Sequence, residues 1–260
     1  MDYLEQEREK IAKFTKVGII VLSCLVVFGL GINYVPNAVP ANTTTARELP
    51  IYCVNTDEKK VALSFDAAWG NESTKGILDC LNQYQVKATF FMTGGWIEAY
   101  PEDVKAIYQA GHDLGNHSEN HKQMSTLSIE QCKEELQVPH QKVKELTGYD
   151  MTLFRPPFGD YNNTLIDCTK SIHYHCVQWD VDSLDWRDYG TDSIVNTILN
   201  HEHLGNGSII LMHNGGKYTL AALPRVIEGL KAKGYTIVPI SQLIYTDEYL
   251  IDHEGRQYQK

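Results

Sequence analysis

The chain has 260 residues, of which 43% are hydrophobic and 22% charged, so it carries enough apolar sequence to bury a substantial core. Its formal net charge is −10, and no cluster of Lys and Arg is interleaved with aromatic residues. This composition excludes a disordered chain. It also predicts no nucleic-acid partner, because no basic field would attract a phosphate backbone.

The six cysteines are too widely spaced for a zinc ribbon or a disulfide-stapled scaffold. No Cys-x-x-Cys pair occurs, and one cysteine lies in an apolar N-terminal run. We expect most of them to be small buried side chains, with a single disulfide as the open alternative. They are Cys24, Cys53, Cys80, Cys132, Cys168 and Cys176.

Residues 17–35 form an apolar run with no charged side chain. Its length is close to the roughly 20 residues that cross a bilayer, and it lacks the polar face of a typical core helix. Lys13 and Lys16 precede the run, and the next charge is Arg47. By the positive-inside rule, residues 1–16 are predicted to be cytoplasmic, and the run to be a single-pass membrane anchor for an exported domain.

A polar segment connects this predicted anchor to the folded part of the chain. Residues 36–57 contain prolines, small residues and a Thr triplet, and are expected to form a linker and the first strand. Small residues at Val39-Pro40-Ala41 leave an alternative, which is cleavage near Ala41 and secretion. An uncleaved anchor is favoured because the preceding segment is long and mixed in charge.

From residue 58 to 245, apolar strand-like segments alternate with helix-like segments, which predicts parallel strands wrapped by helices. About seven such units, without Gly-x-Gly-x-x-Gly after the first strand, favour a barrel over a dinucleotide-binding sheet. The polar tail 246–260 is expected to be a surface extension. The predicted strands are 61–65, 87–92, 112–115, 151–154, 174–179, 207–212 and 235–239. The predicted helices are 73–83, 101–110, 128–146, 162–171, 191–203 and 219–233.

Candidate catalytic residues follow these strands, where active sites of α/β barrels collect. Asp66 ends an apolar strand and is a candidate carboxylate at the rim, with a helix N-cap or turn role as the alternative. His117 and His121 follow another strand and are four residues apart. That spacing would place both imidazoles on one side of a helical turn, as in sites for zinc or a similar divalent metal. With ten histidines in the chain, a chance spacing is the alternative.

Two further loops carry candidate residues. Arg155 and Phe158 flank two prolines that hold the backbone rigid, although an ordinary Pro-Gly turn is the alternative. Asp182 and Asp185 lie in an acidic loop that is either solvated or part of a site. The neighbouring Trp186 favours a site, because its apolar face suits stacking on a sugar ring.

His213 ends the apolar strand 207–212. An imidazole at this position can act as a general acid when a carboxylate fixes its tautomer and keeps it protonated. Asp185 is the candidate partner.

Five sequence motifs occur in a fixed order along the chain. Together they resemble the polysaccharide deacetylase family, carbohydrate esterase family 4, with its NodB homology domain. They are Ser64-Phe65-Asp66, His117-x-x-x-His121, Arg155-Pro-Pro-Phe158, Asp182-x-x-Asp185-Trp186 and Leu211-Met-His213. The Asp66-Ala-Ala-Trp-Gly sequence and the N-terminal apolar run look most like the membrane-anchored branch associated with sporulation. The resemblance implies a distorted (β/α) barrel over 58–245 and metal-dependent removal of N-acetyl groups from amino sugars.

The resemblance also implies a role for each matching residue. Asp66 matches the general base, Arg155 the residue that orients it, and His213 the general acid paired with Asp185. His117 and His121 match the metal ligands. The remaining matches are the Phe158 amide as oxyanion donor, and Trp186 and Leu211 as the wall of the acetyl pocket.

One position departs from the family pattern. The family's first motif usually has a second aspartate, which is the third metal ligand, whereas this chain has Ala67. Catalytic zinc normally has three protein ligands, so the expected divalent metal (Zn, or alternatively Co, Ni or Mn) has only two here. The alternative is that no metal is bound.

The leading hypothesis is therefore a membrane-anchored deacetylase that acts on a cell-wall polysaccharide, most plausibly peptidoglycan, which lies within reach of an anchored enzyme. A rival from another class is a glycan-binding protein that keeps the groove without turnover. A third hypothesis is an esterase for O-acetyl sugars, because an ester is the easier acyl group to cleave.

Overall fold

The computed structural model describes residues 2, 7–10, 12–15 and 47–260. Arg47–Lys260 form one compact unit. The predicted membrane helix, 17–35, lies outside the described residues. Within the part of the chain that is described, no helix combines the length and apolar content needed to cross a membrane.

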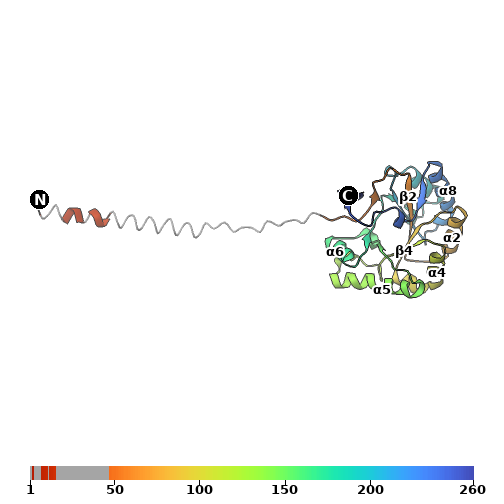
Figure 1. Ribbon diagram of the computed structural model, residues 1–260, viewed down its shortest axis with the longest axis horizontal. Helices are drawn as coiled ribbons and strands as arrows, with labels where there is room; N and C mark the ends of the chain where they lie inside the picture. The colour runs from red at the N-terminus through yellow and green to blue at the C-terminus, as the bar shows by residue number, and fades with distance from the viewer. Residues whose placement is uncertain (1, 3–6, 11, 16–46) are drawn as a thin grey trace. The chain divides into compact units, whose positions relative to one another are not determined.

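The domain is a curved sheet of parallel strands, with helices around the outside (Figure 1). Seven strands follow the order β6-β5-β4-β3-β2-β8-β7, and an eighth, β9, pairs with the start of β2. The sheet is thus a half-barrel whose two ends, β6 and β7, follow each other in the chain. The bounds are β2 Lys60–Ala67, β3 Thr89–Met92, β4 Asp113–Asn116, β5 Leu153–Phe154, β6 His175–Cys176, β7 Val181–Asp182, β8 Ile209–His213 and β9 Thr236–Val238.

Alternation along the central strand β2 separates the two faces of the sheet. Phe65 and Ala67 belong to the larger hydrophobic cluster, which includes the buried faces of the surrounding helices. Ala62 lies in a second cluster on the opposite face, inside the curve of the sheet. Ser64 and Asp66 share the face of Ala62, so this strand directs its only carboxylate into the half-barrel.

The helices lie close to the ranges predicted from the sequence. Ser128 and Gln131 form a reciprocal capping box at the start of α5, and Gly148 ends that helix at a φ of 76°. A short helix, α3, was not expected. The bounds are α2 Thr74–Gln83, α3 Gly94–Ala99, α4 Pro101–Gln109, α5 Ile129–Thr147, α6 Asn163–Ser171, α7 Thr191–Leu199 and α8 Thr219–Ala232.

Two parts of the sequence-based prediction need correction. The single strand expected over 174–179 is only β6, and the chain then leaves the sheet before entering β7. The tail 246–260 is not a simple surface extension, because it forms β10 (Tyr249–Ile251) and β11 (Arg256–Gln259). β11 pairs in parallel with β1 (Cys53–Val54), which makes a second, three-stranded sheet.

The Gln257 side chain connects this second sheet to the segment around Tyr245 through two hydrogen bonds. Its side chain is fully buried, its Nε2 donates to the Tyr245 carbonyl (2.6 Å), and its Oε1 accepts from the Tyr245 amide (2.9 Å). Replacement by Ala leaves both backbone groups without partners, at about 1–3 kcal/mol for a buried unsatisfied group. We predict that urea unfolding shows Gln257→Ala destabilised by about 2–4 kcal/mol. The exposed Gln259→Ala on the same strand should change stability by less than about 0.5 kcal/mol, and equal effects would contradict this role.

Candidate active site

The carboxyl ends of the parallel strands surround a cavity of about 440 Å³. Of the residues expected from the sequence, seven line it: Asp66, His117, His121, Phe158, Trp186, Leu211 and His213. Arg155 and Asp185 are fully buried and hydrogen-bond the lining residues Asp66 and His213. Side chains separated by almost 150 positions in the sequence therefore meet at one site.

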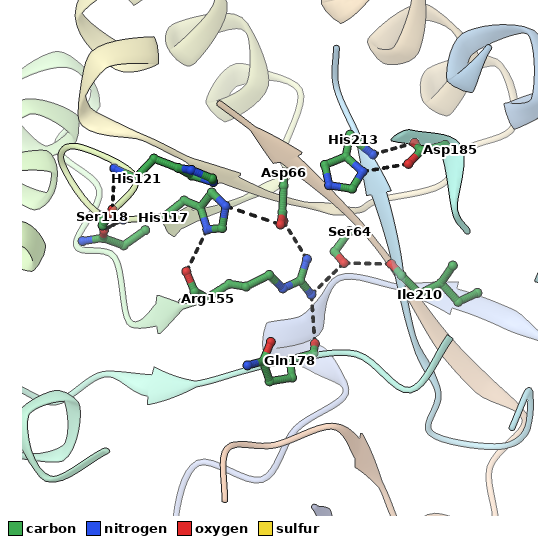
Figure 2. Close-up of polar contacts among 11 residues, drawn as sticks. Ser64, Asp66, His117, Ser118, His121, Arg155, Gln178, Asp185, Ile210 and His213 are labelled. Atoms are coloured by element: carbon green, nitrogen blue, oxygen red, sulfur yellow. Dashed lines mark hydrogen bonds and ion pairs between the residues drawn. The ribbon is translucent and has the colours of Figure 1, made fainter. Parts of the chain in front are cut away.

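A buried ion pair holds Asp66 in place. Arg155 Nη1 donates to Asp66 Oδ1 at 2.7 Å, and both side chains are nearly or completely inaccessible to solvent. Arg155 Nη2 also donates to Ser64 Oγ (2.9 Å) and to the Gln178 carbonyl (3.0 Å). The guanidinium lies 4.2 Å from the centroid of the Phe91 ring, a cation–π contact. Figure 2 shows Arg155 at the centre of this network.

The charge on Asp66 follows from these neighbours. Burial is the largest single influence and raises the pKa of the carboxyl, but the charge and hydrogen bond of Arg155 and the charges of two histidines together outweigh it and hold the pKa below 3.8. These histidines are His117 and His213. Asp66 is therefore ionised at neutral pH. Arg155 bonds its Oδ1, while Oδ2 lies 3.5 Å from His117 Nε2.

The two candidate metal ligands meet, but not through a helical turn as the sequence predicted. Residues 117–121 are an irregular loop in which Ser118 and His121 have φ values of 68° and 50°. The two imidazole centroids are 5.0 Å apart, with an interplanar angle of 66°. Glu135 of α5 supports this loop by accepting from both the backbone and the side chain of Asn120.

His117 has the protonation state of a metal ligand. Its Nδ1 lies 2.7 Å from the Arg155 carbonyl oxygen, which can only accept, so Nδ1 carries the proton and Nε2 is left with its lone pair. Burial lowers the pKa of His117 to about 4, so the ring is neutral at pH 7. Burial also lowers the pKa of His121. Neutral imidazoles oriented by a backbone carbonyl are typical of metal sites.

These residues nevertheless provide fewer ligands than a complete metal site needs. Among the described residues, no group of three His, Cys, Asp or Glu side chains is arranged to hold a metal ion. The family's third ligand position is Ala67, whose side chain is fully buried in the cluster on the helix side of β2. The residues therefore fit two ligands of a divalent ion and lack the third that catalytic zinc usually has.

His213 faces the cavity from the last long strand, β8, with Asp185 behind it. Its Nδ1 donates to Asp185 Oδ1 and its backbone amide to Oδ2, both at 2.7 Å, while Thr219 Oγ1 also donates to Oδ2 (2.6 Å). Burial is the largest single influence and lowers the pKa of His213, but the hydrogen bond to Asp185 and the charges of the nearby carboxylates together outweigh it and raise the pKa above 6.5. These carboxylates are Asp185, Asp66 and Asp182. His213 is thus suited to donate a proton from Nε2.

Trp69 and Trp179 also line the cavity, although no role was predicted for them from the sequence. Asp182, whose loop we expected to be either solvated or part of a site, lines the cavity as well. Trp69 and Trp179 follow β2 and β6, and Asp182 ends β7, so the strand-end signal that identified Asp66 also applied to them. Asp180 belongs elsewhere, because its carboxylate is buried against the Ile209 amide and Ser208 hydroxyl. Because side chains alternate between the two faces of a strand, Ser64 shares the face of Asp66. This pattern would have identified Ser64 as a neighbour of the site.

Comparisons with known proteins show which family this chain resembles. A family model described as polysaccharide deacetylase matches residues 54–177. The chain is 35% identical over 196 residues to a peptidoglycan-N-acetylglucosamine deacetylase of Bacillus cereus, with 74% of this chain and 91% of that protein covered. The chain belongs to the polysaccharide deacetylase family. It is also 34% identical to the uncharacterized protein YlxY of Bacillus subtilis, covering 75% of this chain but only 60% of YlxY.

A solved structure gives a similar fold with a different functional description. BA3943 of Bacillus anthracis, described as a pseudoenzyme of this family (CE4), superposes with a TM-score of 0.72 and 31% identity, over 76% of this chain and 69% of BA3943. A mutant of BA3943 is described as having restored enzymatic activity. Membership of the family therefore does not by itself establish turnover.

The Asp185–His213 pair predicts a pH dependence with a definite sign. A His pKa raised above its unfolded value stabilises the fold fully below pH 6.5, and this stabilisation is lost as pH rises through the folded pKa. We predict that Asp185→Asn lowers the pKa of His213 in an NMR titration. The variant should also lose more unfolding free energy at pH 6 than at pH 9. The exposed His253 provides the internal control, and an unchanged His213 midpoint would contradict the pairing.

Proposed function

We propose that this protein is a hydrolase that removes N-acetyl groups from the amino sugars of a cell-wall polysaccharide, namely peptidoglycan. One observation carries the proposal. Asp66, fixed by Arg155, and His213, fixed by Asp185, face the same cavity from β2 and β8, two neighbouring strands. An ionised carboxylate and a protonated imidazole on two sides of a substrate are the base and acid that amide hydrolysis requires.

Asp66 and His213 each carry out one proton transfer of the proposed reaction. Asp66 accepts a proton from a water molecule, whose oxygen forms a bond to the acetyl carbonyl carbon. His213 donates a proton to the sugar nitrogen as the C–N bond breaks, which releases acetate and leaves a free amine. Without this protonation the amine would be a poor leaving group, and the tetrahedral intermediate would revert. The Phe158 amide is the proposed oxyanion donor, an interaction worth about 10²–10³ in rate.

A divalent ion held by His117 and His121 would, when bound, polarise the acetyl carbonyl and lower the pKa of water. We propose zinc, with Co, Ni or Mn as alternatives. The neutral state of His117 and the orientation of its Nε2 toward the cavity support this assignment.

The shape of the cavity and the named relatives support a glycan substrate. Trp186 and Leu211 line one wall, and such apolar surfaces suit the acetyl methyl group and the face of a sugar ring. The Bacillus cereus relative is named for its action on peptidoglycan N-acetylglucosamine, whereas a Bacillus subtilis relative that is 33% identical, PdaC, is named for N-acetylmuramic acid. We therefore propose that the substrate is an amino sugar of peptidoglycan, either N-acetylglucosamine or N-acetylmuramic acid.

We further propose that the domain works outside the cytoplasm as a membrane-anchored protein, with secretion after cleavage near Ala41 as the alternative. The uncharged apolar run 17–35, preceded by Lys13 and Lys16, supports this location. A sporulation role rests on the likeness of the Asp66–Gly70 sequence to that branch of the family.

Acetate release tests the proposed reaction. The purified full chain should release acetate from N-acetylglucosamine oligomers or peptidoglycan when a divalent metal is added. His213→Ala should lower kcat by about 10²–10⁴, because the departing amine loses its acid. The His253 side chain is 90% exposed and does not line the cavity, so His253→Ala should leave the rate unchanged. No release with any of the metals would argue strongly against turnover.

A glycan-binding protein without turnover is the second candidate, and Ala67 favours it. Elemental analysis distinguishes the two. A catalytic metal site predicts close to one ion per purified chain, and less metal in His121→Ala than in His253→Ala. A chain that binds the oligomers, retains no metal and releases no acetate would establish the second candidate.

A further inference from the structure

Gln178 contacts two separate parts of the proposed active site. It comes shortly after β6, is only 1% exposed and does not itself line the cavity. Its backbone carbonyl accepts from Arg155 Nη2 (3.0 Å), and its side-chain Nε2 donates to the Gly159 carbonyl (3.1 Å). Figure 2 shows Gln178 below the Arg155 guanidinium. One buried residue therefore bonds both the guanidinium that fixes Asp66 and the loop that carries Phe158.

The backbone of that loop needs support from outside. Phe158 and the following Gly159 have φ values of 60° and 66°, so two consecutive residues are left-handed. This conformation is costly for a residue with a side chain and persists only where the surroundings hold it. Phe158 is largely exposed, so burial of its ring does not hold the loop. Support comes from neighbouring segments, because Ser125 donates to the Asp160 carboxylate and Gln178 donates to the Gly159 carbonyl.

The stability of the fold does not account for the buried amide of Gln178. Its Oε1 is buried and has no hydrogen-bond partner among the described residues, so one of the two polar groups of the side chain is unsatisfied. A buried unsatisfied group costs at least as much free energy as a single hydrogen bond contributes. Gln257 differs, because both of its side-chain polar atoms are bonded. For stability alone, an apolar side chain of similar length would suit position 178 at least as well.

We propose that Gln178 is a positioning residue, which holds the loop of the Phe158 amide in a fixed place relative to the Arg155–Asp66 pair. An oxyanion donor and a general base stabilise one transition state only when both are already in position. Gln178 touches no reacting atom and acts through the Gly159 carbonyl and the guanidinium. The inference rests on the proposed function for its effect on rate, but its effect on the loop does not depend on turnover.

Gln178→Met tests the proposal, because methionine has a similar length and no hydrogen-bond donor. In the purified full chain, kcat for acetate release should fall roughly 5- to 50-fold, less than the factor of about 10²–10³ expected for loss of an oxyanion donor itself. KM should change less than about twofold, because the oxyanion donor acts on the transition state rather than on the bound substrate. The variant should unfold at nearly the same urea concentration as the wild type.

Gln257→Met is the matched control, because Gln257 is equally buried but bonds Tyr245, and neither residue lines the cavity. This variant should unfold at a lower urea concentration and keep the wild-type kcat, which is the reverse of the result expected for Gln178→Met. An active protein in which Gln178→Met leaves kcat unchanged, or in which both variants lower kcat equally, would overturn the proposal.

Amide hydrogen exchange gives a readout that does not need turnover. The Gly159 amide donates to the Pro156 carbonyl (3.1 Å), a hydrogen bond that closes the loop. This amide should exchange about fivefold faster or more in Gln178→Met, and at the wild-type rate in Gln257→Met. Unchanged exchange in Gln178→Met would overturn the proposal whether or not the protein releases acetate. Faster exchange in a protein that releases no acetate would refute the proposed reaction and leave the loop contact of Gln178 standing.

Discussion

The buried guanidinium of Arg155 is the contact on which the arrangement of the site depends. Its side chain joins Asp66 and Ser64 of β2 to the Gln178 carbonyl, and its own carbonyl fixes the tautomer of His117. One residue therefore sets the charge of the proposed base and the orientation of a proposed metal ligand. Its removal would leave a buried carboxylate unpaired, so the same contact supports both folding and chemistry.

The half-barrel places the proposed base and the proposed acid next to each other. Asp66 and His213 pair directly in register between β2 and β8, so adjacent parallel strands present a carboxylate and an imidazole to the same cavity. Their pKa values move in opposite directions, because Arg155 favours the ionised carboxyl and Asp185 favours the protonated imidazole. This separation allows one site to supply both a base and an acid near neutral pH.

Much of this arrangement follows from sequence, because period-two alternation and strand-end polar residues are local signals. They indicated Asp66, His213 and the order of strands and helices. The conformation between His117 and His121 could not be read from their spacing, because a helical turn and a loop with left-handed residues both bring such side chains together. The C-terminal hairpin was missed because β11 pairs with β1, about 200 residues away, and its short polar segments give no apolar pattern. Trp69 was overlooked although it follows the same strand as Asp66, because its indole is held by a hydrogen bond to the Gly215 carbonyl, far along the chain.

Ala67 affects the proposed metal site of this family member rather than its fold. The methyl group of Ala67 lies in the hydrophobic cluster on the helix side of the sheet. The two candidate metal ligands, the proposed base Asp66 and the proposed acid His213 all line the cavity. A crystal structure with the N-acetylglucosamine trimer would test the account most directly. We predict that the acetamido group of one sugar lies between Asp66 and His213. A trimer bound outside this cavity, or one with no acetamido group near these two residues, would contradict it.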